Sequence, residues 1–419
     1  MRILKLTQRT EAELMKVREG QDRAARETAG RIVADVRRRG DAALNEWTRK
    51  LDGGELQRDG VWISRKEFQS ARKRVSREFL DAAAHAAENV RRVAERQKPT
   101  DWNLQVEPGV KVGQIVRPIE TIGCYIPGGR FALISTLMMT VVPAQVAGVR
   151  QIIAVCPRPN DELLAVAGML GMTRLAKIGG AQAIAAVAYG TQRIPRVEKI
   201  FGPGNRYVTA AKQIVSEECA IDLPAGPTEA VVLANRGNPA WIAADLLAQA
   251  EHAPDAGSFL VTTSARVAKR VQAEVAAQLV ALPKENPAQI SIRKSGAILL
   301  ARTWKEACGF VNRFAPEHLS LPEEGGSALQ AIHSAGTVFL GPLSAQAFGD
   351  YASGSNHVLP TGGWARRRGG LSTEDFVKRI SVQRIDRKGY QRLANDVALL
   401  ARAEGLHAHA NAIEVRRWR

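Results

Sequence analysis

Histidine side chains in this sequence gather in a few short segments that also carry carboxylate and amide groups. The chain has 7 His, and most of them lie in these segments: His252, His318, His357, His407 and His409. The segments are far apart, at residues 248–252, 315–319, 349–360 and 404–409. Imidazole is the commonest transition-metal ligand in proteins, and it titrates near neutral pH. The clustering therefore indicates an enzyme site that contains a metal ion.

A carboxylate and an imidazole occupy consecutive positions at Glu317 and His318, directly after Pro316. Consecutive side chains usually diverge, so the two groups would do different work, such as activating water and abstracting a proton. The alternative is a solvent-exposed polar pair. The sequence alone leaves both interpretations open.

Gln249 and His252 are three residues apart at the end of a helix expected over residues 239–251, which we take to extend to His252. At that spacing both side chains project from one helix face and could reach one ion, although Gln is an uncommon zinc ligand. A simple polar helix face is the alternative. Asp350, in an expected turn, is either an oxygen ligand or an ordinary turn aspartate. His357 is either a ligand contact or another turn residue.

Helices and strands alternate in the part of the chain that must bring these groups together. Short apolar runs predict strands at residues 151–156, 175–178, 199–201, 231–234 and 259–263. Helical patterns separate them at residues 162–170, 181–188, 239–251 and onward from Asn205. This alternation favours parallel sheets with crossover helices. The first hundred residues are expected to be helical, and the tail from about Leu371 is expected to be mostly helical and polar.

Two glycine-rich turns lie between an expected strand and an expected helix. They are Gly179-Gly180-Ala181-Gln182 and Gly202-Pro203-Gly204-Asn205. Backbone N–H groups at the start of a helix can receive phosphate groups. The alternative is a tight turn that lets a helix pack on its sheet. The usual Gly-x-Gly-x-x-Gly dinucleotide pattern does not follow any expected strand.

Composition limits the class of protein. A chain of 419 residues is too long for one ordinary core, so we expect two or three domains. No apolar run approaches the ~20 residues that a membrane span needs, and the first residues lack the pattern of a signal peptide, so we expect a cytoplasmic protein. The 4 Cys show no CxxC spacing, which argues against disulfides and a thiolate zinc site.

The net charge of +17 raises the possibility of nucleic-acid binding. The Arg residues are nevertheless spread along helix-like segments, aromatic residues make up only 5% of the chain, and no RNA-binding or zinc-finger pattern occurs. Solvated helix faces are the favoured explanation. Part of the charge could attract an anionic dinucleotide.

Taken together, the motifs resemble the histidinol dehydrogenase family over essentially the whole chain. Besides the His-containing segments, the resemblance rests on Tyr125-Ile126-Pro127-Gly128-Gly129-Arg130, Gly179-Gly180-Ala181-Gln182-Ala183-Ile184-Ala185, Phe201-Gly202-Pro203-Gly204-Asn205 and Asp222-Leu223-Pro224-Ala225-Gly226-Pro227. Several motifs of this length in the family's order are a specific signal.

The resemblance implies an α/β fold with two Rossmann-like domains, parallel-rich sheets and small helical segments at both ends. One domain would be discontinuous, formed by residues 24–124 and 229–370, and of incomplete dinucleotide-binding type. Residues 125–228 would form the second domain, which contacts NAD. Residues 1–23 would be an N-terminal helical segment, and the helical tail of residues 371–419 would dock on a partner subunit.

The resemblance also implies the activity and the roles of single residues. It predicts zinc- and NAD-dependent oxidation of L-histidinol to L-histidine through bound L-histidinaldehyde, in a homodimer with shared active sites and one Zn²⁺ per subunit. Glu317 and His318 would be catalytic. The metal ligands would be Gln249, His252, Asp350 and His409, the last from the partner subunit. Those four, His318, Thr228, His357 and Glu404 would contact the substrate, and NAD would contact Tyr125, Gln182 and Asn205.

One residue departs from the family pattern. Thr228 stands where the family usually has Ser after Ala-Gly-Pro, which keeps a hydroxyl and adds a methyl group. His407 matches no family role and is expected at the surface. The alternative activity is oxidation of another amino- or sulfo-alcohol by the same fold. A basic nucleic-acid-binding protein, without enzyme activity, is the remote alternative.

Overall fold

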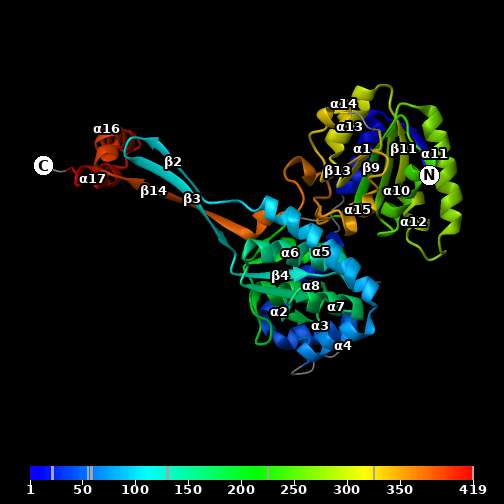
Figure 1. Cartoon of the computed structure of the whole chain (residues 1–419), viewed down its shortest axis with the longest axis horizontal. Helices are drawn as coiled ribbons and strands as arrows, with labels where there is room; N and C mark the ends of the chain where they lie inside the picture. The colour runs from blue at the N-terminus through cyan, green and yellow to red at the C-terminus, as the bar shows by residue number, and fades with distance from the viewer. Residues whose placement is uncertain are drawn as a thin grey trace.

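Two parallel sheets and one long antiparallel ribbon organise the chain in the computed structural model (Figure 1). The structure describes residues 1–19, 23–53, 56, 60–128, 132–223, 226–323 and 326–417. Gly129, Arg130, Pro224 and Ala225 of the family-like motifs lie outside these residues. The α/β class and the parallel-rich sheets expected from the sequence are confirmed.

The first sheet has six strands in the order β1-β11-β10-β9-β12-β13, with every pair parallel. Its strands are β1 (Arg2–Lys5), β9 (Glu229–Leu233), β10 (Gly257–Thr262), β11 (Gly296–Leu300), β12 (His318–Leu321) and β13 (Thr337–Leu340). Its helices are α1 (Gln8–Glu19), α10 (Pro239–Ala250), α11 (Ala265–Ala281), α12 (Ala288–Lys294), α13 (Trp304–Phe314), α14 (Gly326–Ala331) and α15 (Gln346–Tyr351). Every residue of β9 and β10 is buried, as expected for strands covered on both faces.

The second sheet has five parallel strands in the order β6-β5-β4-β7-β8. These are β4 (Thr121–Tyr125), β5 (Gln151–Val155), β6 (Leu175–Ala176), β7 (Lys199–Phe201) and β8 (Ala220–Ile221). The helices that follow its strands are α6 (Ile134–Ala147), α7 (Asp161–Met169), α8 (Gly180–Tyr189) and α9 (Arg206–Val215). In both sheets the order of strands reverses around one central pair, β4 with β7 and β9 with β12, as in doubly wound folds.

The helices of the first hundred residues pack against the five-stranded sheet. They are α2 (Arg23–Arg39), α3 (Asp41–Asp52), α4 (Arg65–Arg74) and α5 (Arg77–Gln97). Ile32 and Val36 share one core with Ile153 and Ile184, for example. We had expected residues 24–124 to belong with 229–370. Helical periodicity reveals a buried face but not the sheet that covers it, so this packing could not be taken from the sequence.

Both ends of the chain contain a strand as well as helices. At the N-terminus β1 adds to the edge of the six-stranded sheet beside β11 before α1 begins. The tail, expected to be mostly helical, starts with the nine-residue strand β14 (Val377–Ile385) before α16 (Arg387–Ala403) and α17 (His407–Glu414). All residues of β14 except Val377 are exposed, so its sequence lacks the buried face that marks a strand.

An extended arm leaves the body of the molecule. β14 pairs antiparallel with β3 (Val110–Pro118), which pairs with β2 (Trp102–Glu107), and α16 and α17 lie at the far end of this ribbon (Figure 1). At its base, the ring of Phe376 stacks on Phe201 at 4.0 Å, and the Ile119 N–H donates to the Phe376 carbonyl. The arm is thus anchored on the five-stranded sheet, beside β7.

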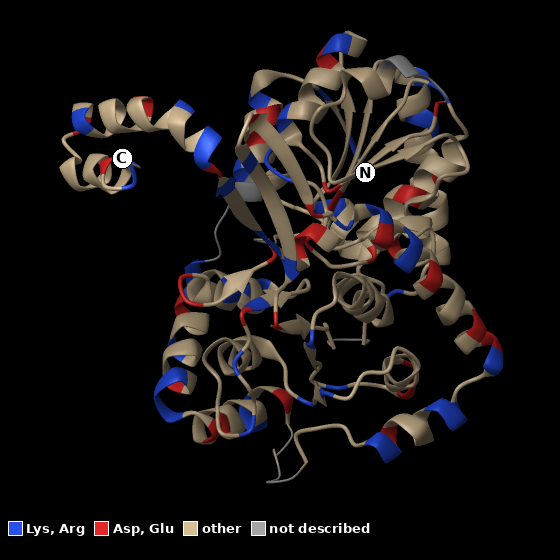
Figure 2. Cartoon of the chain, turned by 60° about the vertical axis from the view of Figure 1, so that its left-hand side comes forward, with Lys and Arg blue, Asp and Glu red and all other residues tan. Residues whose placement is uncertain are grey.

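Charged residues are distributed over the whole molecule. Figure 2 shows Lys and Arg on the helices around both sheets and on the arm, interspersed with Asp and Glu. This distribution agrees with solvated helix faces. Within the described ranges, no helix is both long and apolar enough to cross a membrane.

Candidate functional site

Most of the candidate residues meet at the amino-terminal edge of the six-stranded sheet. Thr228 directly precedes β9, and His318 is the first residue of β12, where it pairs with Ala230 of β9. The end of α10 and the short helix α15 lie at the same edge, because α10 runs back from the carboxyl end of β9. The fold therefore brings together Thr228, Gln249, His252, Glu317, His318, Asp350 and His357.

Glu317 is a buried carboxylate with two hydrogen-bond donors. Its Oε2 accepts from the Thr228 hydroxyl at 2.5 Å and from the Glu229 N–H at 3.0 Å. Burial raises the pKa of Glu317 to about 7, against the opposing effect of these two donors. The side chain is held in place after Ala315, whose left-handed φ of 49° ends α13. Such a carboxyl group exchanges protons near neutral pH, and the solvent-exposed alternative is wrong.

His318 is equally buried and has one ring nitrogen available. Its Nδ1 lies 3.3 Å from the Glu229 carbonyl, so Nδ1 carries the proton and donates it to that oxygen. Its Nε2 is buried without a hydrogen-bond partner among the described residues. Burial lowers the pKa of His318, while nearby Asp350 opposes the shift. The neutral ring thus presents an unprotonated Nε2, which is what a general base requires.

Gln249 and His252 reach the site from different backbone environments. The expectation of one helix for both is wrong, because α10 ends at Ala250 and His252 lies in the bend that follows. Pro254 disfavours helical backbone at the residue before it, which helps to stop the helix there. Gln249 is fully buried, whereas the His252 side chain is 43% exposed. A buried amide and an accessible imidazole therefore approach the site from one helix end.

Asp350 lies between the two histidines. It is part of α15 and not of the turn that we expected. Its Oδ2 is 3.9 Å from Nε2 of His252, and its Oδ1 is 3.8 Å from Nε2 of His318. Gly349 permits this approach, since a Cβ there would lie 2.7 Å from the Phe339 ring, which stacks on His318. Asp350 is thus shared by a candidate ligand and a candidate base.

The donor set formed by Gln249, His252 and Asp350 fits a zinc ion. It offers an amide oxygen, an imidazole nitrogen and a carboxylate, and zinc binds nitrogen and oxygen ligands at about 2.0–2.2 Å. A separation of 3.9 Å between the His252 and Asp350 atoms lets both reach one ion after a small adjustment. Among the described residues of this one chain, no group of three or more His, Cys, Asp or Glu is placed to hold a metal. A metal ion held at this edge would thus take the Gln249 amide as one of its ligands.

His357 has both ring nitrogens engaged. Its Nδ1 is 2.9 Å from the backbone carbonyl of Asp350, and its Nε2 is 3.2 Å from the Thr136 hydroxyl. Thr136 belongs to α6, which follows β4 of the five-stranded sheet. His357 thus holds the Asp350 backbone and connects the two sheet regions. This contact brings α6 of the five-stranded sheet next to the candidate catalytic residues.

The three residues expected to contact NAD lie at the carboxyl ends of strands in the five-stranded sheet. Tyr125 is the last residue of β4, Gln182 is in the first turn of α8, and Asn205 caps α9 after β7. The pair β4 and β7 is where the strand order reverses, and doubly wound folds bind dinucleotides in that crevice. Gln182 is fully buried, its Nε2 donates to Asp52, and its Oε1 has no partner among the described residues.

Glu404 and His409 lie apart from the other candidates. Glu404 caps the end of α16, and His409 is in α17, at the far end of the arm (Figure 1). Both side chains are exposed, as is His407. Figure 1 shows this end of the arm well away from α10 and α15 of the same chain. The fold does not bring these two residues to the site within one subunit.

Sequence reasoning missed two groups of residues that shape these sites. Gln346 of α15 donates to Gln249, and a buried pair of Lys212 and Asp222 clamps the turn at Gly202. Nothing in the sequence marks Gln346 as part of the site, because polar residues on short helices are common. Asp222 belongs to a family-like motif, but its partner ten residues earlier is visible only once α9 and β8 are folded.

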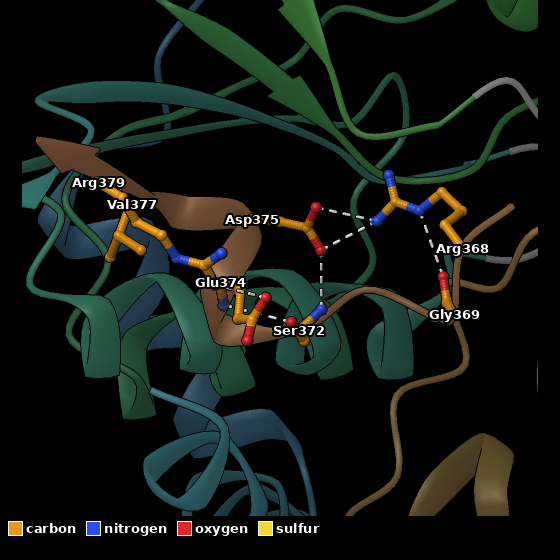
Figure 3. A pocket seen from close by; sticks show the side chains of 8 residues that line it. Arg368, Gly369, Ser372, Glu374, Asp375, Val377 and Arg379 are labelled. Atoms are coloured by element: carbon orange, nitrogen blue, oxygen red, sulfur yellow. Dashed lines mark hydrogen bonds and ion pairs between the residues drawn. The ribbon is translucent and has the colours of Figure 1, made fainter. Parts of the chain in front are cut away.

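A cavity of about 510 Å³ lies at the base of the arm, and none of the candidate catalytic residues lines it. It is lined by Arg368, Gly369, Gly370, Ser372, Glu374, Asp375, Val377 and Arg379 (Figure 3). The guanidinium of Arg368 donates to both carboxylate oxygens of Asp375, at 2.9 and 3.0 Å, and Arg379 pairs with Glu374 at 2.7 Å. The charged side chains that line this cavity are therefore paired with one another, and the pairs stabilise the start of β14.

Comparison with known proteins gives a consistent result. A model of the histidinol dehydrogenase family matches residues 15–417. Histidinol dehydrogenase of Methanothermobacter thermautotrophicus is 45% identical over 395 residues, which cover 92% of each chain. That of Geobacillus kaustophilus is 46% identical over 393 residues, with the same coverage. The crystal structure of histidinol dehydrogenase from Elizabethkingia anophelis is 37% identical, covers 99% of this chain and 98% of that one, and superposes with a TM-score of 0.94.

Proposed function

Because this chain belongs to the histidinol dehydrogenase family, we propose that it oxidises L-histidinol to L-histidine by two successive hydride transfers to NAD. L-histidinaldehyde stays bound between the two steps. The family places the enzyme among the oxidoreductases of histidine biosynthesis. The observation that carries the proposal is the buried pair of Glu317 and His318, two proton-transfer groups whose pKa values shift in opposite directions beside one candidate metal site.

In the first oxidation, Nε2 of His318 takes the proton of the substrate alcohol while the carbon atom loses a hydride. The lowered pKa keeps this nitrogen unprotonated at neutral pH. The hydrogen bond from Nδ1 to the Glu229 carbonyl fixes the tautomer and the orientation of the ring. Proton transfer by a positioned side chain contributes on the order of 10²–10⁴-fold to a rate. The product of this step is the aldehyde.

In the second oxidation, Glu317 accepts a proton from water as the water oxygen attacks the aldehyde carbon. The resulting anion of the hydrate, RCH(OH)O⁻, then loses a hydride and becomes the carboxylic acid, while Glu317 retains the proton taken from water. A carboxyl group with a pKa of about 7 is ionised in a large fraction of molecules at neutral pH and is more basic than an ordinary carboxylate. The donors Thr228 and Glu229 hold Oε2 in position.

Gln249, His252 and Asp350 would hold the zinc ion, with His409 of a second copy as the fourth ligand. When bound, zinc supplies a positively charged template for the nitrogen atoms of the substrate. Thr228 and His357 lie at the same edge and would contact the substrate, as would Glu404 from the second copy. For His357 such a contact requires exchange of one of its present partners.

Tyr125, Gln182 and Asn205 would hold the dinucleotide at the switch point of the five-stranded sheet. When bound, NAD accepts the hydride in each oxidation. The Oε1 of Gln182 has no partner among the described residues but is buried, so a hydrogen bond to the cofactor would require the start of α8 to open. The contact between His357 and Thr136 brings this sheet to the catalytic edge, which supports hydride transfer between ligands held by different sheets.

The geometry of the arm supports a homodimer with shared active sites, which we expect in the cytoplasm. The ribbon and its helices expose many large apolar side chains, a property typical of a surface that a partner covers. They include Trp102, Leu104, Val106, Ile380, Val382, Leu399, Leu400 and Leu406. Docking the arm on a second copy would bury them and carry Glu404 and His409 into that copy's site.

The test is NADH formation from L-histidinol by the purified protein, before and after chelation and zinc re-addition. Activity lost on chelation and restored by zinc supports the proposal. Thr228, in place of the usual Ser, favours including a panel of other amino- and sulfo-alcohols. The absence of histidinol turnover by folded, zinc-loaded dimer would overturn the assignment, and turnover of another alcohol would then identify the substrate.

A further inference from the structure

A second glutamine stands directly behind the candidate ligand Gln249. The Nε2 of Gln346 donates to Oε1 of Gln249 at 2.6 Å. Both side chains are buried, with Gln249 fully inaccessible and Gln346 only 3% exposed. Gln346 begins α15 and lies four residues before Asp350, so the two project from the same face of that helix. The end of α10 and the bend that follows it therefore approach α15 at two points, Gln249 with Gln346 and His252 with Asp350.

The direction of the neighbouring hydrogen bonds fixes the orientation of the Gln249 amide. The Thr228 hydroxyl has one hydrogen, which it donates to Glu317. Thr228 can therefore only accept from Gln249, and the Gln249 Nε2 lies 2.8 Å from its oxygen. The amide oxygen of Gln249 must then point the other way, toward Gln346. A carbonyl oxygen has two lone pairs, so one remains for a metal ion after Gln346 has donated to the other.

We propose that Gln346 is a positioning residue that holds the Gln249 carboxamide with its oxygen directed at the metal. This inference rests on the proposed function and deepens it. Hydrogen bonds from outside the ligand shell orient ligands and commonly affect metal affinity by 10–100-fold. An unsupported glutamine would have three rotatable bonds to fix when it binds the ion. Gln346 removes that freedom before the metal arrives.

The experiment measures zinc affinity of the full-length protein by competition with a chelator. Gln346→Leu, which keeps the volume and removes the donor, is expected to weaken zinc binding by about 10–100-fold and to raise KM for histidinol. Because the ligand set itself is intact, kcat at saturating zinc is expected to change far less. Gln346→Glu places an acceptor where the donor stood, so it cannot hold the Gln249 oxygen and is expected to weaken zinc binding to a similar extent.

The matched control is Gln278→Leu. Gln278 donates its Nε2 to the Ala240 carbonyl at the opposite end of α10, at 2.9 Å. Loss of that bond is expected to leave zinc affinity within about twofold of the wild-type value, because it is remote from the ligands. If Gln346→Leu does not fold, Gln346→Asn replaces it, with an amide one methylene too short to reach Gln249 and the same expected loss.

Two results would overturn the positioning role. One is zinc affinity and KM of Gln346→Leu equal to those of the wild type. The other is a loss in Gln346→Leu combined with wild-type zinc affinity in Gln346→Glu, which would assign Gln346 to packing, because Gln346→Glu keeps the size of the side chain and removes the donor. A wild-type chain that binds no zinc would instead refute the proposed function, so the two failures are distinguishable.

Discussion

The Nε2 atom of His318 lies 3.8 Å from Oδ1 of Asp350. Burial of the imidazole lowers its pKa, and the carboxylate limits that decrease. Asp350 also faces His252 at 3.9 Å, so one carboxylate group adjoins a candidate base and a candidate metal ligand. Substrate bound at the metal would therefore lie within reach of the His318 nitrogen.

Replacement of His318 by Asn is expected to lower kcat for histidinol by about 10²–10⁴-fold, because the base is removed while most of the shape remains. In the wild type, the first oxidation requires unprotonated His318. Since its pKa lies below the ordinary 6.5, the rate is expected to stay constant down to that pH and to fall only in more acidic solution. Single-turnover NADH formation between pH 5 and pH 8, as a rough range, measures this. An unchanged rate in the variant would exclude His318 as the base.

Replacement of Glu317 by Gln is expected to affect oxidation of the aldehyde more than oxidation of the alcohol. The ionised carboxylate is the active form, and its pKa of about 7 means that aldehyde oxidation should rise as pH increases through neutrality. The variant should lose this rise and slow by about 10²-fold or more. The assay is NADH formation with histidinaldehyde as substrate. Equal effects on both oxidations would contradict separate roles for Glu317 and His318.

Mixed dimers test whether the arm completes the site of a second copy. His409→Asn and His318→Asn are each expected to be inactive alone. In a heterodimer, both defects fall in one site and the other site is intact, so random mixing should restore roughly a quarter of wild-type activity. The variants are mixed, dissociated and reassociated before assay. If His409 served its own chain, the mixture would remain inactive.

The pair of Lys212 and Asp222 is predicted to stabilise the turn that presents Asn205. Lys212 and Asp222 are 4% and 0% exposed, and they bind the Gly202 carbonyl and N–H respectively. Lys212→Met leaves a buried carboxylate uncompensated and should lower the free energy of unfolding by about 3–5 kcal/mol, with a higher KM for NAD. Urea denaturation and kinetics measure both effects.

The control for that experiment is the surface pair of Arg74 and Asp161, joined at 2.6 Å with side chains 54% and 38% exposed. Arg74→Met should lower the free energy of unfolding far less than Lys212→Met does and leave KM for NAD unchanged. If the two variants lost the same free energy of unfolding, burial would not make the Lys212–Asp222 pair more important for stability than a surface pair.

The sequence predicted the α/β class and the central strands, because buried parallel strands are short apolar runs bounded by turns. It could not predict β14, whose pairing with β3 lies in an exposed ribbon. Nor could it assign α2 and α5 to the five-stranded sheet. An apolar helix face is the same whichever sheet it covers.

The candidate site, like the fold, could be predicted only in part from the sequence. Glu317 and His318 were recognisable because a carboxylate next to an imidazole is chemically distinctive. Their burial, and the hydrogen bond that leaves Nε2 of His318 free, depend on Glu229 nearly ninety positions earlier. The support that Gln346 gives to Gln249 spans 97 positions and has no local signature. The sequence thus indicated which residue types could take part in the site, whereas the orientation of their side chains could be read only from the folded structure.

The most direct test of the account is the number of NADH molecules formed for each L-histidinol consumed by the zinc-loaded protein. We predict two, with no free aldehyde in solution, because His318 and Glu317 serve successive oxidations at one site. Formation of a single NADH with release of histidinaldehyde would contradict this central claim.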